Sequence, residues 1–166
     1  VESIKHAKAA KVPIVVAINK CDLPEADPQK IKNQLLEHEL IAEELSGDTL
    51  MVEISTKTKK NLDKLLESIQ LQSELLDLKT DFDTKASGSV IESKIDIGKG
   101  PIVNIIVTTG TLKKGDYFVC GLKSGKVRAI INDLGTNIDE AIPATPVEVL
   151  GINGAAKAGD DFLVFE

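Results

Sequence analysis

The chain has 166 residues, of which 42% are hydrophobic and 28% are charged, and its formal net charge is −6. This composition is typical of folded globular proteins, and the length allows one domain or two small ones. The negative charge argues against tight non-specific binding to nucleic acid, although a local basic patch remains compatible with it.

Three features bear on where the protein works. No apolar run reaches the roughly 20 residues that cross a bilayer, and no secretory signal opens the chain, so we expect no membrane association. The two cysteines, Cys21 and Cys120, form neither a metal-binding nor a disulfide pattern. We therefore expect a reducing compartment, either a bacterial cytoplasm or an organellar matrix. The chain begins at Val1 without a methionine, and we expect it to be a fragment.

The two halves of the chain differ in composition. Residues 1–80 contain one glycine, whereas residues 81–166 contain eleven glycines and all five aromatic residues. Such a shift predicts two domains with different folds, at 1–78 and 86–166. The polar segment 79–85 lacks a helical period and is expected to be the linker.

The first half alternates between helical and strand patterns. Both predicted strands are continuous apolar runs, typical of buried parallel strands. Asp27 and Pro28 supply an N-cap and a first-turn proline for the middle helix. The order predicts a parallel α/β sheet, which we expect to include further strands before Val1. The expected elements are a helix over 2–11, a strand over 14–18, a helix from 27 to about 45, a strand over 50–54 and a helix over 61–78.

The second half has the pattern of an all-β domain. Short apolar runs alternate with glycine-containing turns, and Gly98-Lys99-Gly100 marks a hairpin. Several strands within about 80 residues predict a small antiparallel barrel, because closure removes exposed sheet edges. The expected strands lie at 90–97, 102–109, 117–120, 126–132, 147–152 and 162–165.

Polar motifs follow both strands of the first half at the point where each strand ends. The sequence N-K-C-D occupies residues 19–22, and S-T-K occupies residues 55–57. Ligands of parallel α/β sheets bind beyond the carboxyl ends of the strands, so we expect the two motifs to lie together. A single motif of this kind could be a solvated turn, whereas the pair is a specific signal.

The chemistry of these side chains fits a guanine base. An ionised Asp22 can accept hydrogen bonds from the ring N–H and the exocyclic amine together, a pair that adenine lacks. Lys20 and Lys57 can lay their methylene stems against the two faces of the base. Ser55 can brace the loop, so that the backbone N–H near Thr56 points at the base oxygen. The candidate base-binding residues are therefore Asn19, Lys20, Asp22, Ser55, Thr56 and Lys57.

The two motifs resemble the base-recognition motifs of the P-loop GTPases. Longer stretches, including HAKAAKVPIVVAINKCDLPEADPQKIK, GSVIESKIDIGKGPIVNIIV and GTLKKGDYFVCG, are similar to bacterial and organellar translation initiation factor two. The resemblance covers essentially the whole chain. It implies the carboxyl-terminal part of a GTPase domain with a Rossmann-like parallel sheet, followed by the β-barrel second domain of translation factors.

The resemblance also implies a function. Members of that family bind GTP or GDP and the ribosome, place initiator tRNA on the small subunit and promote subunit joining. We therefore expect a monomeric fragment of a translation initiation GTPase. Its expected partners are the small subunit and its ribosomal RNA, with initiator tRNA engaged by the full-length protein.

The chain departs from the family pattern in two respects. Thr56 stands where the family usually has alanine, which leaves the backbone N–H in place. No G-x-x-x-x-G-K-[ST] motif occurs in the sequence, and the switch segments that hold Mg²⁺ and the catalytic histidine are absent. We therefore assign no catalytic or metal-binding residue, expect Mg²⁺ in the full-length protein alone, and expect this chain by itself to be inactive as a GTPase.

Basic residues also gather on neighbouring turns and strands of the expected barrel. The resemblance makes them candidate contacts for ribosomal RNA, and an ordinary solvated barrel surface is the other interpretation. These residues are Lys113, Lys114, Lys123, Lys126 and Arg128.

Two other functions remain open at this point. The chain could belong to another translational GTPase, such as an elongation-type or selenocysteine-specific factor. It could instead be a ribosome- or RNA-binding module with no nucleotide function of its own. A dinucleotide-binding unit is disfavoured, because no G-x-G-x-x-G follows either strand.

Overall fold

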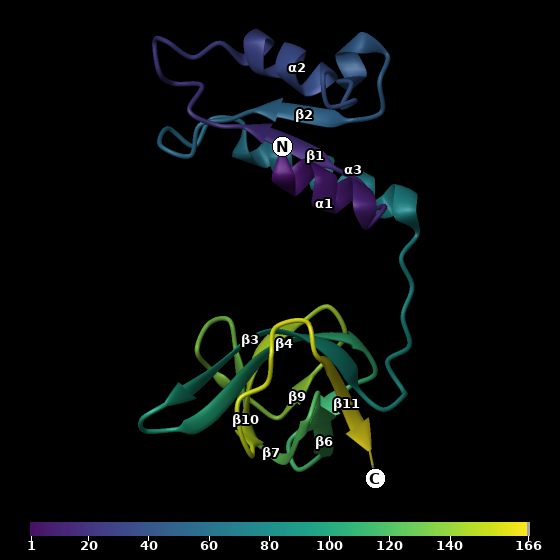
Figure 1. Ribbon diagram of the computed structural model, residues 1–166, viewed down its shortest axis with the longest axis vertical. Helices are drawn as coiled ribbons and strands as arrows, with labels where there is room; N and C mark the ends of the chain where they lie inside the picture. The colour runs from purple at the N-terminus through teal and green to yellow at the C-terminus, as the bar shows by residue number, and fades with distance from the viewer. Residues whose placement is uncertain (166) are drawn as a thin grey trace. The chain divides into compact units, whose positions relative to one another are not determined.

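A computed structural model describes residues 1–165. The chain divides into two compact units, Val1–Leu78 and Lys79–Glu166, which are labelled by element in Figure 1.

The first unit is a small parallel sheet with helices. Its two strands pair in parallel, with Val15 opposite Leu50 and Ile18 opposite Glu53. In Figure 1, α2 lies on one side of this sheet, and α1 and α3 lie on the other. This arrangement confirms the predicted α/β architecture. The elements are α1 (Glu2–Ala9), β1 (Val15–Ile18), α2 (Pro28–Leu36), a 3-10 turn η1 (Glu43–Leu45), β2 (Leu50–Glu53) and α3 (Leu62–Leu76).

The middle helix starts as predicted but ends early. The Asp27 side chain accepts a hydrogen bond from the Lys30 N–H at 3.0 Å, and Pro28 occupies the first turn. The expected continuation to about residue 45 is wrong, because α2 ends at Leu36. Glu39 adopts a φ of 59°, a left-handed conformation that breaks the helix and that usually calls for glycine or asparagine.

The second unit is a closed antiparallel barrel. Six strands follow one another in the order β10-β4-β3-β11-β6-β7, and β7 pairs back with β10 to close the sheet. The predicted barrel is therefore confirmed. The strands of this unit are β3 (Ser87–Asp96), β4 (Gly100–Thr109), β5 (Leu112–Lys113), β6 (Tyr117–Cys120), β7 (Lys123–Asn132), β8 (Asn137–Ile138), β9 (Glu140–Ala141), β10 (Pro146–Ile152) and β11 (Asp161–Phe165). Within the described residues, β8 pairs with β7 alone, and β5 pairs with β9 in a separate two-stranded sheet.

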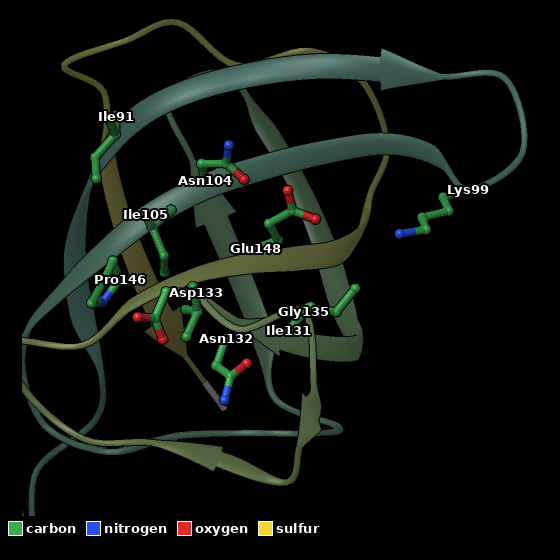
Figure 2. A pocket seen from close by; sticks show the side chains of 11 residues that line it. Ile91, Lys99, Asn104, Ile105, Ile131, Asn132, Asp133, Gly135, Pro146 and Glu148 are labelled. Atoms are coloured by element: carbon green, nitrogen blue, oxygen red, sulfur yellow. The ribbon is translucent and has the colours of Figure 1, made fainter.

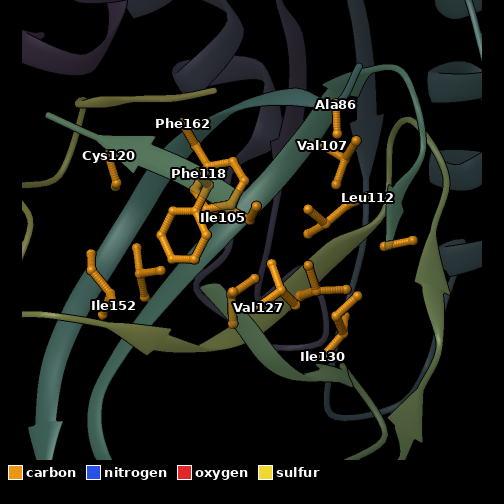
Figure 3. Close-up of a cluster of buried hydrophobic side chains, with 14 of the residues drawn as sticks. Ala86, Ile105, Val107, Leu112, Phe118, Cys120, Val127, Ile130, Ile152 and Phe162 are labelled. Atoms are coloured by element: carbon orange, nitrogen blue, oxygen red, sulfur yellow. The ribbon is translucent and has the colours of Figure 1, made fainter. Parts of the chain in front are cut away.

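The barrel core consists of alternate residues along these strands, which is why the strands could be read from the sequence. The rings of Phe118 and Phe162 stack with centroids 4.6 Å apart, and Figure 3 shows them among the aliphatic side chains that fill the interior. Strand β3 begins three residues earlier than predicted, at Ser87. Gly88 obscured this start, although a Cβ there would lie 2.4 Å from the Ile106 carbonyl oxygen, so the close pairing requires glycine.

The expected linker, 79–85, forms no helix or strand in the described chain. Hydrogen bonds tie part of it to the turn after β4. The Asp81 carbonyl accepts from the Gly110 N–H at 2.7 Å, and the Phe82 carbonyl accepts from the Thr111 hydroxyl at 2.9 Å. These bonds attach the segment to the barrel.

Candidate functional site

The parallel pairing of β1 and β2 places both polar motifs at one edge of the sheet. Ile18 and Glu53, the last residues of the two strands, lie opposite each other. The pairing continues one step further, because the Ile54 N–H donates to Ile18 O at 2.8 Å and the Cys21 N–H donates to Ile54 O at 3.1 Å. The two loops therefore leave the sheet side by side.

Asn19 links the two loops. Its Oδ1 accepts hydrogen bonds from the Lys20 N–H at 2.7 Å and from the Thr56 N–H at 3.1 Å, and its Nδ2 donates to Thr56 Oγ1 at 3.3 Å. The Thr56 N–H is therefore paired with Asn19, so the expected N–H near Thr56 that points at a base oxygen has to come from a neighbouring residue. The Lys57 N–H is the next donor along the loop, and it donates no hydrogen bond to another group within residues 1–165.

A second link joins Asp22 to Ser55. Ser55 is fully buried, and its hydroxyl donates to Asp22 Oδ1 at 2.7 Å. The Thr58 N–H donates in turn to Ser55 Oγ at 3.1 Å, which fixes the serine. The Ser55 hydrogen bond, aided by the charge of Lys57, lowers the pKa of the Asp22 carboxyl. Asp22 is thus an ionised, oriented acceptor at the edge of the sheet.

The remaining members of the two motifs are placed as follows. Lys20 and Lys57 are exposed, and Lys20 has a φ of 63°. Cys21 is half-buried and its thiol donates to Ile18 O at 3.1 Å, in keeping with a packing role. A hollow of about 380 Å³ borders residues 18–21 and the start of α2, but its lining does not include Asp22 or residues 55–57. The structure therefore brings the two motifs together without enclosing them in one cavity.

Sequence reasoning missed a residue that supports this edge. The Asn61 Nδ2 donates to the carbonyl of Glu53, two residues before the second motif begins at Ser55, at 2.8 Å. Asn61 has a φ of 53°, in the left-handed region that asparagine tolerates better than most residues. An asparagine between the S-T-K motif and a helical period could have indicated this role.

The basic residues of the barrel fall on two neighbouring segments. Lys113 and Lys114 lie at the end of β5 and in the turn after it, and the other three lie on β7. The two segments are joined, because the Gly115 N–H donates to Val127 O at 2.9 Å and the Val127 N–H donates to Asp116 O at 2.8 Å. Lys126 Nζ lies 4.9 Å from the centre of the Tyr117 ring, a cation–π contact.

Within residues 1–165, no group of three or more histidine, cysteine, aspartate or glutamate side chains is arranged to hold a metal ion. None of the helices in that part of the chain is long and apolar enough to span a membrane.

Comparison with known proteins assigns both units. Residues 1–74 match the elongation factor Tu GTP binding domain, and residues 85–165 match elongation factor G domain 2. Translation initiation factor IF-2 from Pelagibacter ubique is 76% identical over all 166 residues. The chain belongs to the initiation factor two family. IF-2 from Rhodospirillum rubrum is 55% identical over the same length. The chain spans 23% and 19% of these two relatives.

Solved structures of translation factors share the fold. GDP-bound aIF5B from Aeropyrum pernix superposes with a TM-score of 0.81 at 22% identity, over 99% of this chain and 36% of that one. Elongation factor SelB from Methanococcus maripaludis gives a TM-score of 0.70 at 20% identity, over 99% of this chain and 36% of that one. The match of the first unit to a GTP binding domain implies guanine nucleotide binding.

Proposed function

We propose that this chain carries the base-recognition part of the guanine nucleotide site of a translation initiation GTPase. The observation that carries the proposal is the buried Ser55 hydroxyl holding an ionised Asp22 at the edge where both strands end. This arrangement favours a ligand with two adjacent N–H donors, as guanine has and adenine lacks.

The other residues of the two motifs have complementary roles in this proposal. Asn19 holds the two loops at a fixed spacing through its bonds to Lys20 and Thr56. The Lys57 N–H is the donor for the base oxygen, and the stems of Lys20 and Lys57 cover the two faces of the base. Selectivity then depends chiefly on Asp22.

Hydrolysis requires groups that these residues do not supply. Positioning of the phosphates and Mg²⁺ accounts for most of the catalysis in P-loop enzymes, and the sequence contains no G-x-x-x-x-G-K-[ST]. We therefore expect the 166-residue chain to bind nucleotide weakly and to release no phosphate from GTP above background. Mg²⁺-dependent phosphate release by the purified chain would contradict this assignment.

The whole protein would act on the ribosome in the bacterial cytoplasm, as a monomer. In this proposal the barrel faces ribosomal RNA through Lys113, Lys114, Lys123, Lys126 and Arg128, and initiator tRNA is engaged by other parts of the full-length protein. Support comes from the high identity to IF-2 over the whole chain.

The proposal is tested by Asp22→Asn in a chain extended to the length of its relatives. The substitution replaces one acceptor oxygen by a donor that opposes the guanine amine. A buried polar group without a partner costs about 1–3 kcal/mol, so GTP affinity should fall at least about tenfold. Affinity for a xanthine nucleotide, which carries an oxygen in place of the amine, should rise relative to GTP. A competition titration of GTP against XTP measures both effects.

Leu23→Ala is the matched control. Leu23 follows Asp22 directly, and its side chain is 38% exposed. Its truncation should change the packing of the loop and leave the ratio of GTP to XTP affinity unchanged. If Asp22→Asn keeps the wild-type ratio as well, Asp22 does not read the base and the guanine site is wrongly assigned.

A further inference from the structure

A groove of about 410 Å³ lies on the barrel, bordered by β3, β4, β7, β10, the turn between β3 and β4, and the turn after β7. Figure 2 shows Asn104 and Glu148 near its middle, Pro146 and Asp133 together at one end, and Lys99 at the other end. No role proposed above uses this groove, and it contains none of the basic residues assigned to ribosomal RNA.

The middle of the groove contains an unpartnered hydrogen-bond acceptor. Asn104 Oδ1 is buried and has no hydrogen-bond partner in the described chain. The Asn104 Nδ2 donates to Glu92 Oε2 at 3.4 Å. Because a carboxylate accepts hydrogen bonds and does not donate them, this contact fixes the amide with its nitrogen toward Glu92. A buried acceptor without a donor is unfavourable, so the groove favours a ligand that brings an N–H group.

Acidic groups outnumber basic ones around this acceptor and so favour a cation, because Glu92, Glu148 and Asp133 face two lysines, Lys94 and Lys99. Glu92 on β3 and Glu148 on β10 are the direct neighbours of Asn104 across the sheet. Glu148 is half-buried and forms an ion pair with Lys94 at 3.3 Å. The negative charge of Glu92 lies next to Asn104 on the other side. The exposed carboxylate of Asp133 adds a further negative charge to the lining.

The walls of the groove are apolar and one of them is held in place. Ile91, which is 55% exposed, and Pro146 line it together with the side chain of Ile131. The turn after β7 is fixed by Asn132, whose Oδ1 accepts from the Leu134 N–H at 3.1 Å and from the Thr136 N–H at 2.9 Å. A ligand in this groove would therefore meet a preformed apolar surface.

We propose that this groove binds an arginine side chain presented by a partner polypeptide. A guanidinium is flat, carries five N–H donors and is weakly hydrated, so it can pack on apolar walls while donating to Asn104 Oδ1 and to the neighbouring carboxylates. A lysine ammonium has the charge but is strongly hydrated and has no flat face. The arrangement thus selects arginine by shape as well as by charge.

The test is a titration of the isotopically labelled 166-residue chain with N-acetyl-arginine amide, followed by NMR. We expect saturable shifts at the backbone amides of Asn104, Asp133 and Glu148 and at the Asn104 side-chain amide. The citrulline analogue has the same shape without the charge, and the lysine analogue has the charge without the shape. The citrulline analogue should bind at least about tenfold more weakly because it lacks a charged donor. The lysine analogue should bind more weakly by a similar factor because its strongly hydrated ammonium has no flat face to pack on the apolar walls.

Substitutions locate the site. Asn104→Leu should weaken arginine binding about tenfold, because a hydrogen bond to a charged group is lost. Asn104→Asp, which keeps the shape of the side chain, should strengthen it and raise the preference for arginine over citrulline. Glu148→Gln should weaken binding, and Glu140→Gln, on β9 outside the groove lining, should leave it unchanged.

Several outcomes would overturn the proposal. These are shifts outside the groove, equal affinities for arginine and citrulline, and binding unaffected by both Asn104 variants. If adenosine monophosphate saturates the same resonances at a lower concentration than arginine, the groove binds nucleotides instead. Shifts at these residues that depend on protein concentration alone would indicate a second copy of the chain as the occupant.

Discussion

The two units differ in how completely they bury their own apolar residues. The barrel encloses a continuous core in which Val103, Phe118 and Ile130 are fully buried. In the first unit, α1 and α3 contain no buried residue in the described chain, and Leu66 and Leu75 of α3 are 68% and 73% exposed. Charge and length are similar in the two halves, so the difference comes from topology.

Closure of the sheet explains the contrast. Each main barrel strand pairs on both sides, so its backbone groups are satisfied and its inner face meets other inner faces. Among the described residues, β1 and β2 pair with each other alone, which leaves each strand one open edge. A two-stranded sheet is marginally stable by itself in water. The site of the proposed base recognition therefore lies on the weaker unit.

The test with the largest expected effect is truncation of a side chain in the barrel core. Phe118→Ala removes a ring that is fully buried against Phe162, and we expect the free energy of unfolding of the barrel to fall by about 3–5 kcal/mol. Urea denaturation followed by circular dichroism measures this value. Val119→Ala is the control, because Val119 faces outward and is 39% exposed. Equal losses for the two variants would contradict the assignment of the core.

A second test compares the two units directly by hydrogen exchange. Strands β4 and β10 pair on both sides. Their amides should exchange only when the whole barrel unfolds, so their exchange rates report the free energy of global unfolding of the barrel. The amides of β1 and β2 should exchange through smaller openings, at rates at least about thirtyfold faster, which corresponds to ~2 kcal/mol. Slower exchange in β1 and β2 than in the barrel would refute the lower stability of the first unit.

The sequence predicted best the features that depend on short, regular patterns. Alternation along β4 and β10 gave the barrel, and the Asp27 cap gave the start of α2. The positions of the two motifs followed from parallel pairing, because strand ends in such a sheet lie at one edge. These features are fixed by periodicity and by the rules of strand pairing.

Features that depend on individual backbone conformations or on contacts between loops were missed. Nothing in the sequence marks Glu39 as left-handed, so the end of α2 was placed too late. The partner of the Thr56 N–H depends on how two loops lie relative to each other, and the sequence did not show that this partner is Asn19. The unpartnered oxygen of Asn104 on a barrel strand was likewise hidden, because a single polar residue in an apolar run does not reveal which hydrogen bonds its side chain makes.

The smallest of the expected effects concerns an ion pair that holds the weaker unit together. Lys32 of α2 is 5% exposed, and its Nζ lies 2.9 Å from Glu44 Oε2 and 3.0 Å from Glu53 Oε1. The hydrogen bond to Glu44, followed by that to Glu53, raises the pKa of Lys32 above its ordinary value of 10.5. The contribution to stability is therefore complete at neutral pH and is lost as the pH rises through the raised pKa.

Lys32→Met keeps most of the aliphatic stem and removes the charge. Because the side chains of Glu44 and Glu53 are 70% and 39% exposed, water can solvate them, and the cost should be about 1 kcal/mol, well below that of losing one partner of a fully buried pair. Hydrogen exchange at Ile54 measures this loss in the first unit, and the barrel should be unaffected. Lys30→Met, at an exposed position of the same helix, controls for the change of charge. An equal effect of the two variants would mean that the ion pair contributes nothing specific, and the first unit would then depend on its few buried apolar residues alone.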